Sequence, residues 1–343
     1  MKIINCFLGK SRGGIEVVAL DYADALAECG YESEILTLKK RNYTDYLIKG
    51  GHKMHYLISR GLNPITILHF IKVIKSAKPN VVFLHGTKAI EFGTNRFVQM
   101  CCPKVKFIGI SHGVINKKYK KLKYALGISN SLKQELNDIG ITNTYLCQNT
   151  TKATNISVSD YHTQHNDTVV IGSMGRASKS KGFDVILHAI SFLKNKGINI
   201  KCKIAGPNKT DYENLINELS IQDEIECLGW INDKDAFYHS IDIYVSGARF
   251  EQFGLTLIEA MVRQCPVIAT ECSGPKEIVT KNCGILVPIN DATALANAIL
   301  KLAQDDNLRQ TYALNGRNRI LSHFNYADLP NRLKKIIEDV CAK

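Results

Sequence analysis

Short runs rich in β-branched residues alternate with segments of helical periodicity along nearly the whole chain. Residues 3–8 (IINCFL) precede a glycine-rich turn, and apolar residues in 15–29 then recur at helical spacing until Gly30. The same order of strand, turn and helix begins again at residues 169–175 (VVIGSMG). Such alternation indicates repeated βα units and a mostly parallel sheet. The predicted fold class is therefore α/β.

Further strands are predicted where a short apolar run ends in small or polar residues, which is where open α/β sheets build their ligand sites. In the first half these runs are residues 33–38, 81–86, 106–113, 124–131 and 144–149, with a helix at 65–77. In the second half they are residues 200–206, 224–230, 242–247, 266–270 and 284–288. Between the halves, residues 157–168 have few large apolar side chains, and we interpret them as a linker.

A chain of 343 residues is long for one hydrophobic core, so two successive nucleotide-fold-like domains with a cleft between them are predicted. With 45% hydrophobic and 22% charged residues, the composition excludes a disordered chain. No apolar run approaches the ~20 residues of a membrane-spanning helix, and residues 1–8 lack the apolar core of a signal peptide. We expect a cytoplasmic protein. The 11 cysteines include no C-x-x-C pair, which favours reduced core thiols over disulfides or a metal site.

The positive charge of the chain is concentrated in its first half. Residues 1–165 carry 23 Lys and Arg against 11 Asp and Glu, whereas residues 166–343 carry 21 of each. A basic half indicates contact with an anionic partner, either a membrane surface or nucleic acid. No RNA-binding signature is present, so no nucleic acid partner is expected. The densest run, residues 117–123, is predicted to form a membrane or acceptor surface, with a plain solvated loop as the alternative; its basic residues are Lys117, Lys118, Lys120, Lys121 and Lys123.

Residues 249–260 (RFEQFGLTLIEA) place two acids around the start of an apolar helix. A predicted strand, loop and helix follow one another here, so Gly254 lies at the helix N-terminus. Unpaired backbone N–H groups and the positive end of the helix dipole favour a phosphate oxygen there, and glycine permits close approach. Glu251 and Glu259 could each accept hydrogen bonds from two sugar hydroxyls. The alternative is an N-cap role for Glu251 and a solvent-facing or salt-bridged Glu259.

A second candidate phosphate site lies in residues 169–193. A strand ends at Gly175-Arg176, a short loop carries Lys179 and Lys181, and a glycine opens the next helix. Arg176 and Lys181 would flank a diphosphate with positive charge, where leaving-group charge develops during transfer. The alternative is that both are ordinary solvated surface residues.

Two features of the first half are weaker. Paired glycines, Gly13 and Gly14, stand at a helix start without the full G-x-G-x-x-G fingerprint, so they indicate backbone contact with phosphate or sugar rather than NAD. His85 and His112 each end a predicted strand before a glycine. His112 is the better candidate for a hydrogen bond to a sugar hydroxyl or leaving oxygen, although a histidine at a strand end is usually structural.

Together, these motifs resemble those of glycosyltransferase family 4, the retaining, metal-independent transferases of the GT-B fold. E-x7-E is Glu251-QFGLTLI-Glu259, GR-x4-KG is Gly175-Arg176-ASKS-Lys181-Gly182, and GG-x-E is Gly13-Gly14-Ile15-Glu16. Weaker similarities are residues 204–207, 228–230, 273–279 and 284–291. The resemblance covers nearly the whole chain, strongly in the second half and loosely in the first. Gln252, where the family commonly has Gly, and Gly247, where Pro-Ser is frequent, depart from the pattern and bear on donor-sugar preference.

The resemblance implies two Rossmann-like domains with parallel sheets facing a central cleft. Residues 1–160 would bind the acceptor, with the last helix, about residues 326–343, packing back on them, and residues 161–325 would bind the donor. Catalytic roles are implied for Glu251, His112, Arg176 and Lys181. The donor would also contact Gly13, Gly14, Gly175, Gly206, Trp230, Phe253, Gly254, Leu255 and, through its ribose, Glu259.

The expected function is a retaining transfer of a hexose or N-acetylhexosamine from a nucleotide diphosphate sugar, with UDP preferred over GDP. The acceptor would be a glycan or lipid-linked glycan of bacterial surface polysaccharide or lipopolysaccharide, at the cytoplasmic face of the membrane. No metal or other cofactor is expected. Two alternatives stay open: a nucleotide-sugar 2-epimerase of the same fold and a non-catalytic nucleotide-sugar-binding module.

Overall fold

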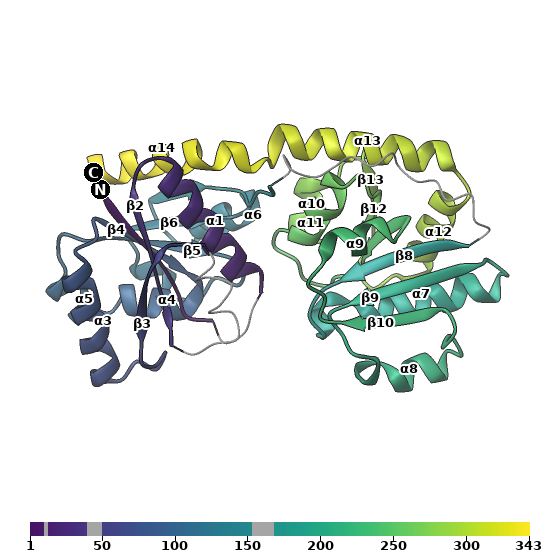
Figure 1. Cartoon of the computed structure of the whole chain (residues 1–343), viewed down its shortest axis with the longest axis horizontal. Coiled ribbons are helices and arrows are strands. Elements are labelled where there is room, and N and C mark those ends of the chain that lie inside the picture. Colours follow the sequence, from purple (N-terminus) through teal and green to yellow (C-terminus); the bar gives the residue numbers. More distant parts are fainter. Residues whose placement is uncertain (10–12, 40–49, 153–167) are drawn as a thin grey trace. The chain divides into compact units, whose positions relative to one another are not determined.

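The computed structural model describes residues 1–9, 13–39, 50–152 and 168–343. The chain forms two compact units, each with its own sheet (Figure 1). Unit 1 is Met1–Asn149 with Tyr326–Lys343, and unit 2 is Thr150–Asn325. The chain thus passes between the units near residues 149 and 325, whereas the sequence placed the first boundary at 160. The predicted linker, residues 157–168, lies outside the described residues except for its last position.

Unit 1 has a parallel sheet of seven strands in the order β3-β2-β1-β4-β5-β6-β7. The strands are β1 (Lys2–Phe7), β2 (Glu32–Leu38), β3 (Lys53–Leu57), β4 (Val81–His85), β5 (Lys106–Ser111), β6 (Tyr124–Gly127) and β7 (Asn143–Leu146). The chain adds β2 and β3 on one side of β1, then returns and adds β4 to β7 on the other side. The strand order therefore reverses between β1 and β4. Ligands bind at the carboxyl ends of strands next to such a reversal.

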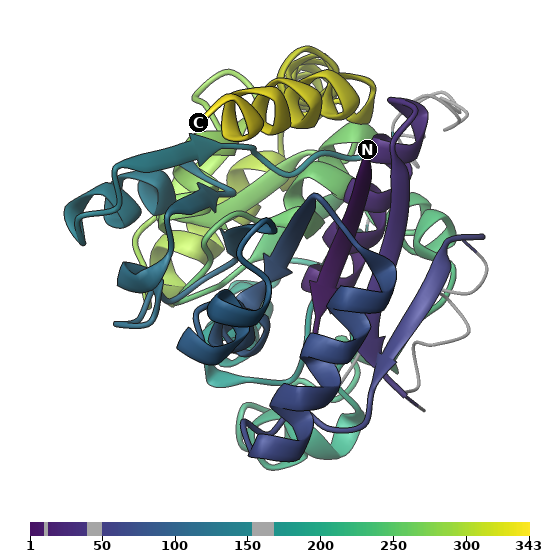
Figure 2. The same ribbon diagram turned by 90° about the vertical axis from the view of Figure 1, so that its left-hand side faces the viewer.

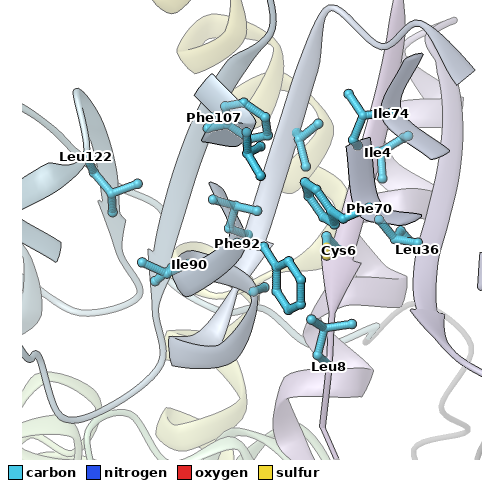
Figure 3. Close-up of a cluster of buried hydrophobic side chains, with 14 of the residues drawn as sticks. Ile4, Cys6, Leu8, Leu36, Phe70, Ile74, Ile90, Phe92, Phe107 and Leu122 are labelled. Carbon is cyan, nitrogen blue, oxygen red and sulfur yellow. The ribbon is translucent and has the colours of Figure 1, made fainter. Parts of the chain in front are cut away.

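One face of the unit 1 sheet is covered by α3 (Pro64–Ala77), α4 (Gly86–Gly93), α5 (Arg96–Cys101) and α6 (Asn130–Asp138). Their apolar sides and the strands enclose the buried cluster in Figure 3, in which Phe70 of α3 stacks on Phe92 of α4 with ring centroids 5.1 Å apart. Asn63 caps α3, since its side chain accepts a hydrogen bond from Thr66 N, and Pro64 occupies the first turn.

The other face carries α1 (Gly14–Glu28), against which the last helix, α14 (Leu329–Ala342), packs. α14 follows a 3-10 turn at Tyr326–Asp328 and buries one apolar side, which is Leu329, Leu333, Ile336, Ile337 and Val340. Cys29 Sγ donates to Pro330 O at 3.3 Å, and Tyr145 Oη donates to Asp339 Oδ2 at 2.5 Å. The chain's last segment is therefore part of the first unit.

Unit 2 has a parallel sheet of six strands in the order β10-β9-β8-β11-β12-β13. The strands are β8 (Val169–Met174), β9 (Ile200–Ala205), β10 (Ile225–Gly229), β11 (Ile243–Ser246), β12 (Val267–Thr270) and β13 (Gly284–Val287). Numbered from β8, this is the Rossmann order 3-2-1-4-5-6, with its reversal between β8 and β11.

The helices of unit 2 are α7 (Phe183–Asn195), α8 (Glu213–Glu218), α9 (Lys234–His239), α10 (Leu255–Val262), α11 (Ser273–Ile278), α12 (Ala292–Ala303) and α13 (Asp306–His323). α7 and α12 pack on each other and on the sheet around a second buried cluster. The strands predicted from β-branched runs are present in both units, and the α/β fold class with parallel sheets is confirmed. The sequence patterns missed β3 and did not define α4, α5, α6, α8, α9, α11, α12 or the 18-residue α13. The few buried positions of α13 give no clear apolar stripe.

Candidate functional site

The predicted donor residues of unit 2 follow four neighbouring strands. Gly175 and Arg176 come after β8, Gly206 after β9, Trp230 after β10, and the loop with Glu251 after β11. Because the carboxyl ends of parallel strands lie along one edge of a sheet, these positions share the edge at the strand-order reversal. The structure therefore gathers residues that are up to 76 positions apart in the sequence.

Lys181 and Glu251 form the central contact of this edge. Lys181 Nζ donates to Glu251 Oε2 at 2.6 Å, and both side chains are partly exposed. The other carboxylate oxygen, Glu251 Oε1, accepts from Phe253 N at 3.4 Å. The Lys181 stem crosses Gly175, where a Cβ would lie 3.3 Å from its methylene carbons. The two polar motifs that the sequence separates by 70 residues thus form one ion pair.

Arg249 ties the loop after β8 to the loop after β11. Its Nη1 and Nη2 donate to the two carboxylate oxygens of Asp184 at 2.7 and 2.6 Å, and Nη1 also donates to Lys179 O at 2.9 Å. Arg249 N donates to Ser180 O at 2.8 Å. The Arg249 guanidinium holds the pKa of Asp184 below its ordinary value, so the bidentate pair stays charged. No sequence pattern had indicated this pair.

Two glycine contacts bring the loop backbones together. Gly182, with φ +62°, caps α7, and a Cβ there would lie 1.8 Å from Gly247 O. A Cβ on Gly206, with φ +112°, would lie 1.8 Å from Gly175 O. Neither position can carry a side chain without movement of the backbone. Gly247, a departure from the family pattern in the sequence, is therefore the surface against which Gly182 packs.

The start of α10 presents unpaired backbone donors beside Glu251. Gly254 is its N-cap with φ +114°, and the helix geometry leaves the N–H groups of Leu255 and Thr256 without an acceptor in the helix. Gly274 holds the preceding backbone in place, because a Cβ there would lie 2.3 Å from Phe253 N, and Gly274 N donates to Glu251 O at 3.0 Å. Unpaired backbone donors at a helix start can bind an anion, which is the role that the sequence predicts for Phe253, Gly254 and Leu255.

Glu259 lies inside α10 and is ion-paired. Lys234 Nζ of α9 donates to Glu259 Oε1 at 2.5 Å, and Tyr238 Oη donates to Oε2 at 3.2 Å. Burial raises the pKa of Tyr238 well above its ordinary value, so its hydroxyl stays a donor. The salt-bridged alternative for Glu259 thus holds in this structure, with a lysine 25 positions away that the sequence analysis did not connect to it.

Three further side chains of the edge differ in exposure. Arg176 is exposed and, within the part of the chain that the structure describes, has no ion pair. Trp230 is also exposed, next to the tie between β9 and β10 in which Gly206 N donates to Gly229 O at 2.6 Å. Gln252 is buried, and its Oε1 has no hydrogen-bond partner among the described residues. Gln252 thus places a buried acceptor directly beside Glu251 in the sequence.

In unit 1, His112 belongs to a chain of three polar side chains at the carboxyl ends of β1, β4 and β5. His85 Nδ1 lies 3.1 Å from His112 Nε2, and His85 Nε2 lies 3.2 Å from Asn5 Oδ1. In this orientation the Asn5 oxygen can only accept, so His85 Nε2 carries the proton and His85 Nδ1 accepts from His112 Nε2–H. His112 Nδ1 is then left as an acceptor. Burial lowers the pKa of His112 to about 3, which keeps the ring neutral.

The remaining predicted residues of unit 1 are placed as follows. Gly13 precedes α1 as its N-cap in an extended conformation, and Gly14 is the first helical residue, while residues 10–12 of this loop lie outside the description. In the basic run, Lys117, Lys118, Lys120, Lys121 and Lys123 are all exposed, around the buried Tyr119. Lys118 Nζ pairs with Glu91, and Lys123 Nζ lies 5.1 Å from the centroid of the Tyr124 ring, so these two lysines are engaged within the unit.

Among the described residues, no three His, Cys, Asp or Glu side chains gather into a group that could hold a metal ion. None of the helices that the structure describes combines the length and the apolar character needed to cross a bilayer.

Comparison with known proteins adds to this geometry. Residues 159–319 match the sequence model of the family described as "Glycosyl transferases group 1". The capsular polysaccharide biosynthesis glycosyltransferase CapM of Staphylococcus aureus is 33% identical over 170 residues, which are 48% of this chain and 44% of CapM. The lipopolysaccharide core biosynthesis glycosyltransferase LpsE of Rhizobium meliloti is 23% identical over 333 residues, 94% of this chain and 95% of LpsE.

Similarity of structure extends over both units. The solved structure of Anabaena HepE in complex with UDP and glucose matches with a TM-score of 0.85 at 16% identity, covering 99% of this chain and 100% of that one. At such identity the match bears on the fold, which is GT-B. Residues 159–319 therefore form a domain of the group 1 glycosyltransferase family, and the similarity to LpsE extends over nearly the whole chain.

Proposed function

We propose that this chain transfers a hexose or N-acetylhexosamine from a UDP-sugar to a glycan or lipid-linked acceptor, with retention at the anomeric carbon and without a metal or other cofactor. The observation that carries the proposal is the Lys181–Glu251 pair, which lies beside the unpaired amides of α10 at the strand-order reversal of unit 2. Such an edge suits a ligand that is anionic in one part and rich in hydroxyls in the next.

The diphosphate of the donor would bind Lys181, Arg176 and the N-terminus of α10. Lys181 would exchange its carboxylate partner for a phosphate oxygen, while Arg176 is exposed and available. Charge-assisted hydrogen bonds from these groups would also stabilise the negative charge that develops on the leaving phosphate. The carboxylate of Glu251 holds Lys181 in the position from which it would reach the phosphate.

Release of Lys181 would free Glu251 for the hydroxyls of the transferred sugar. Glu259, held by Lys234 and Tyr238, keeps lone pairs for the ribose hydroxyls, and the base would lie along Gly206 and residues 228–231 beside the exposed Trp230. Retention would follow from attack on the face that the phosphate leaves, with the departing phosphate accepting the acceptor's proton. The sugar and the phosphate are thus assigned to separate groups of the edge.

His112 would act as a hydrogen-bond acceptor for a sugar hydroxyl. With a pKa of about 3, the His112 ring is neutral at neutral pH. Because His112 Nε2–H donates to His85, which in turn donates to Asn5, the Nδ1 atom of His112 carries no proton. A neutral ring in this state cannot donate from Nδ1 to a leaving oxygen. Of the two roles that the sequence allowed for His112, the structure supports the one toward a hydroxyl.

UDP is the preferred nucleotide, since the HepE structure of the same fold contains UDP. The names of CapM and LpsE support an acceptor in capsular polysaccharide or lipopolysaccharide synthesis. We further propose that the protein works in the cytoplasm at the inner membrane face, where the basic run around Lys117 and Lys120 would contact the acceptor or anionic lipid.

The test measures UDP affinity and sugar transfer separately in two variants. Lys181→Ala should weaken UDP binding about ten-fold or more, because a hydrogen bond from a charged group contributes about 1.5–3 kcal/mol. Glu251→Ala should keep or slightly strengthen UDP binding, since it frees Lys181, while turnover falls about 100-fold. Calorimetric titration with UDP and single-turnover transfer assays give the two quantities.

Lys179→Ala is the matched control, because Lys179 lies in the same 3-10 turn and its side chain is exposed. Unchanged UDP affinity in Lys181→Ala would remove the phosphate role. Formation of an epimer from the UDP-sugar without any acceptor would instead assign the 2-epimerase reaction. Failure of the wild type to bind any of the UDP-, GDP- and ADP-sugars in a thermal-shift panel would favour the non-catalytic alternative.

A further inference from the structure

Unit 1 carries large apolar side chains on the outside of its helical layer. Of the twelve large apolar residues that the structure describes as exposed, six lie on α3, on α5 and in the loop before α3. They are Ile58, Leu62, Ile65, Leu68, Phe97 and Met100, and we call this surface the α3–α5 face. α3 and α5 pack on each other, and Figure 2 shows α3 on the near side of the unit 1 sheet. The face therefore points away from the sheet.

The exposed apolar side chains of α3 are not the ones that pack on the sheet. α3 buries Phe70, Ile71 and Ile74 against the sheet, as an amphipathic helix should. Its opposite side nevertheless presents Ile65, 70% exposed, and Leu68, 55% exposed, one turn apart. Single exposed apolar residues are common, but a contiguous group of them marks a surface that meets another apolar phase or partner.

Positive charge surrounds the apolar residues. Residues 50–134 contain 15 Lys and Arg but one acid, Glu91, which is buried and paired with Lys88 and Lys118. Continuing along the exposed side of α3, the next residues after Ile65 and Leu68 are Lys72 and Lys75. Within the described parts of the chain, neither lysine has an acidic partner, nor do Arg60 and Arg96. This stretch of the chain therefore has no exposed acidic side chain.

We propose that the α3–α5 face docks on an anionic lipid bilayer, with Ile58, Leu62, Ile65 and Leu68 in the interface and the lysines of α3 at the headgroups. Apolar insertion combined with basic residues is the chemistry by which amphipathic helices bind such membranes. A second copy of the chain fits poorly, because two faces of the same positive charge repel. Nucleic acid would be met by basic and aromatic groups rather than by aliphatic ones.

This surface adds a second contact to the peripheral membrane association in the proposed function. The run Lys117–Lys123 offers charge around a buried Tyr119, and the nearest exposed large apolar residue in the sequence is Val114. The α3–α5 face instead combines charge with several apolar side chains. The two can be separated by salt, because screening weakens attraction between charges but not apolar insertion. The measurement uses no sugar transfer, so it can fail while the proposed transferase stands.

The experiment measures sedimentation of the full chain with phosphatidylcholine vesicles that contain or lack phosphatidylglycerol. Wild type should bind the anionic vesicles and keep part of its binding at 0.5 M salt. Ile65→Ser/Leu68→Ser should lower the partition constant roughly ten-fold or more and abolish the salt-resistant part. Lys72→Gln/Lys75→Gln should lower it about five-fold per lysine at low salt only. Neutralising Lys117, Lys118, Lys120 and Lys121 should likewise affect only the salt-sensitive part.

Leu314→Ser is the matched control, since Leu314 is exposed to the same 55% as Leu68 but lies on α13 of unit 2. A direct readout is Leu68→Trp, whose emission should shift to the blue and be quenched by brominated lipid, whereas Leu314→Trp should not respond. Equal vesicle binding by wild type and Ile65→Ser/Leu68→Ser would overturn the proposal. So would a concentration-dependent dimer in sedimentation velocity that this double variant abolishes, since the face would then join two copies.

Discussion

The two histidines of unit 1 show how burial can decide what a side chain does. His85 is buried at the end of β4, edge-on to Tyr22, and His112 stacks on it with ring centroids 5.3 Å apart. Burial lowers the pKa of both rings, that of His112 to about 3, and the second ring disfavours a charge on His85. Each ring is therefore a neutral hydrogen-bonding group at pH 7, with one donor and one acceptor nitrogen.

This pair predicts an acid-sensitive stability of unit 1. An unfolded histidine has a pKa near 6.5, above the folded value, so the unfolded state binds more protons as the pH falls. The stabilising effect is complete above about pH 6.5 and is lost as the pH falls from there toward 3. In guanidinium unfolding at pH 7.5, 6.5 and 5.5, His112→Gln should flatten this decline relative to wild type. His188→Gln, at an exposed site, should leave the decline unchanged, and an equal slope in His112→Gln would contradict the assignment.

The turns between strands and helices set the geometry of the unit 2 edge. Gly182 begins α7 and Gly254 begins α10, both with positive φ, and each places free backbone N–H groups at a helix start. Gly182 also packs on the backbone of Gly247, which brings the loop after β8 against the loop after β11. The position of Lys181 next to Glu251 therefore depends on the contact between the backbones of Gly182 and Gly247.

A pair of glycine substitutions separates backbone strain from this contact. Gly182 and Gly197 have φ of +62° and +72°, but a Cβ at Gly197 would meet nothing within 4 Å, and one at Gly182 would lie 1.8 Å from Gly247 O. Gly197→Ala should cost about 1–2 kcal/mol of unfolding free energy through φ alone. Gly182→Ala should cost more than about 3 kcal/mol and also weaken UDP binding. Urea unfolding and UDP titration of both variants measure this, and equal costs would show that the contact is unimportant.

At the scale of the whole molecule, the chain builds two cores and assigns its last helix to the first. Residues 326–343 lie in unit 1, where Ile337 of α14 is fully buried, although 176 residues of unit 2 precede them. Ile299 of α12 is as fully buried in the core of unit 2. Each unit has its own sheet and core, so each should have its own unfolding transition.

Calorimetry of two matched variants tests this division. Ile337→Ala and Ile299→Ala each leave a cavity that costs about 2–5 kcal/mol. Ile337→Ala should lower the transition of unit 1 and Ile299→Ala that of unit 2. UDP should raise the transition that Ile299→Ala lowers, because the proposed phosphate site lies in unit 2. If Ile337→Ala instead lowered the transition that UDP raises, α14 would contribute to the stability of unit 2 rather than of unit 1.

Local patterns were sufficient for much of the molecule. Alternating β-branched runs and helical periodicity predicted the strands of both sheets except β3, because those signals are carried by residues within one element. Glycines at helix starts predicted where phosphate could bind, since the unpaired N–H groups follow from the helix itself. The motifs around Arg176, Lys181 and Glu251 were predicted to act on one donor, and the parallel sheet brings them to one edge. The boundary of unit 1 near residue 149 was not predicted, because contacts rather than composition define it.

By itself, the sequence determined the α/β class and most of the strands of both sheets, and it predicted a sugar-phosphate site in the second half of the chain. Only the tertiary structure decided which charges meet: Lys181 with Glu251, Lys234 with Glu259, and Arg249 with Asp184. It also placed Asn5 and His85 behind His112 and left the apolar side chains of the α3–α5 face in solvent. The physical reason is the sequence separation over which each kind of interaction acts. Backbone preferences act between residues a few positions apart, whereas ion pairing and burial depend on residues that the fold brings together from distant parts of the chain.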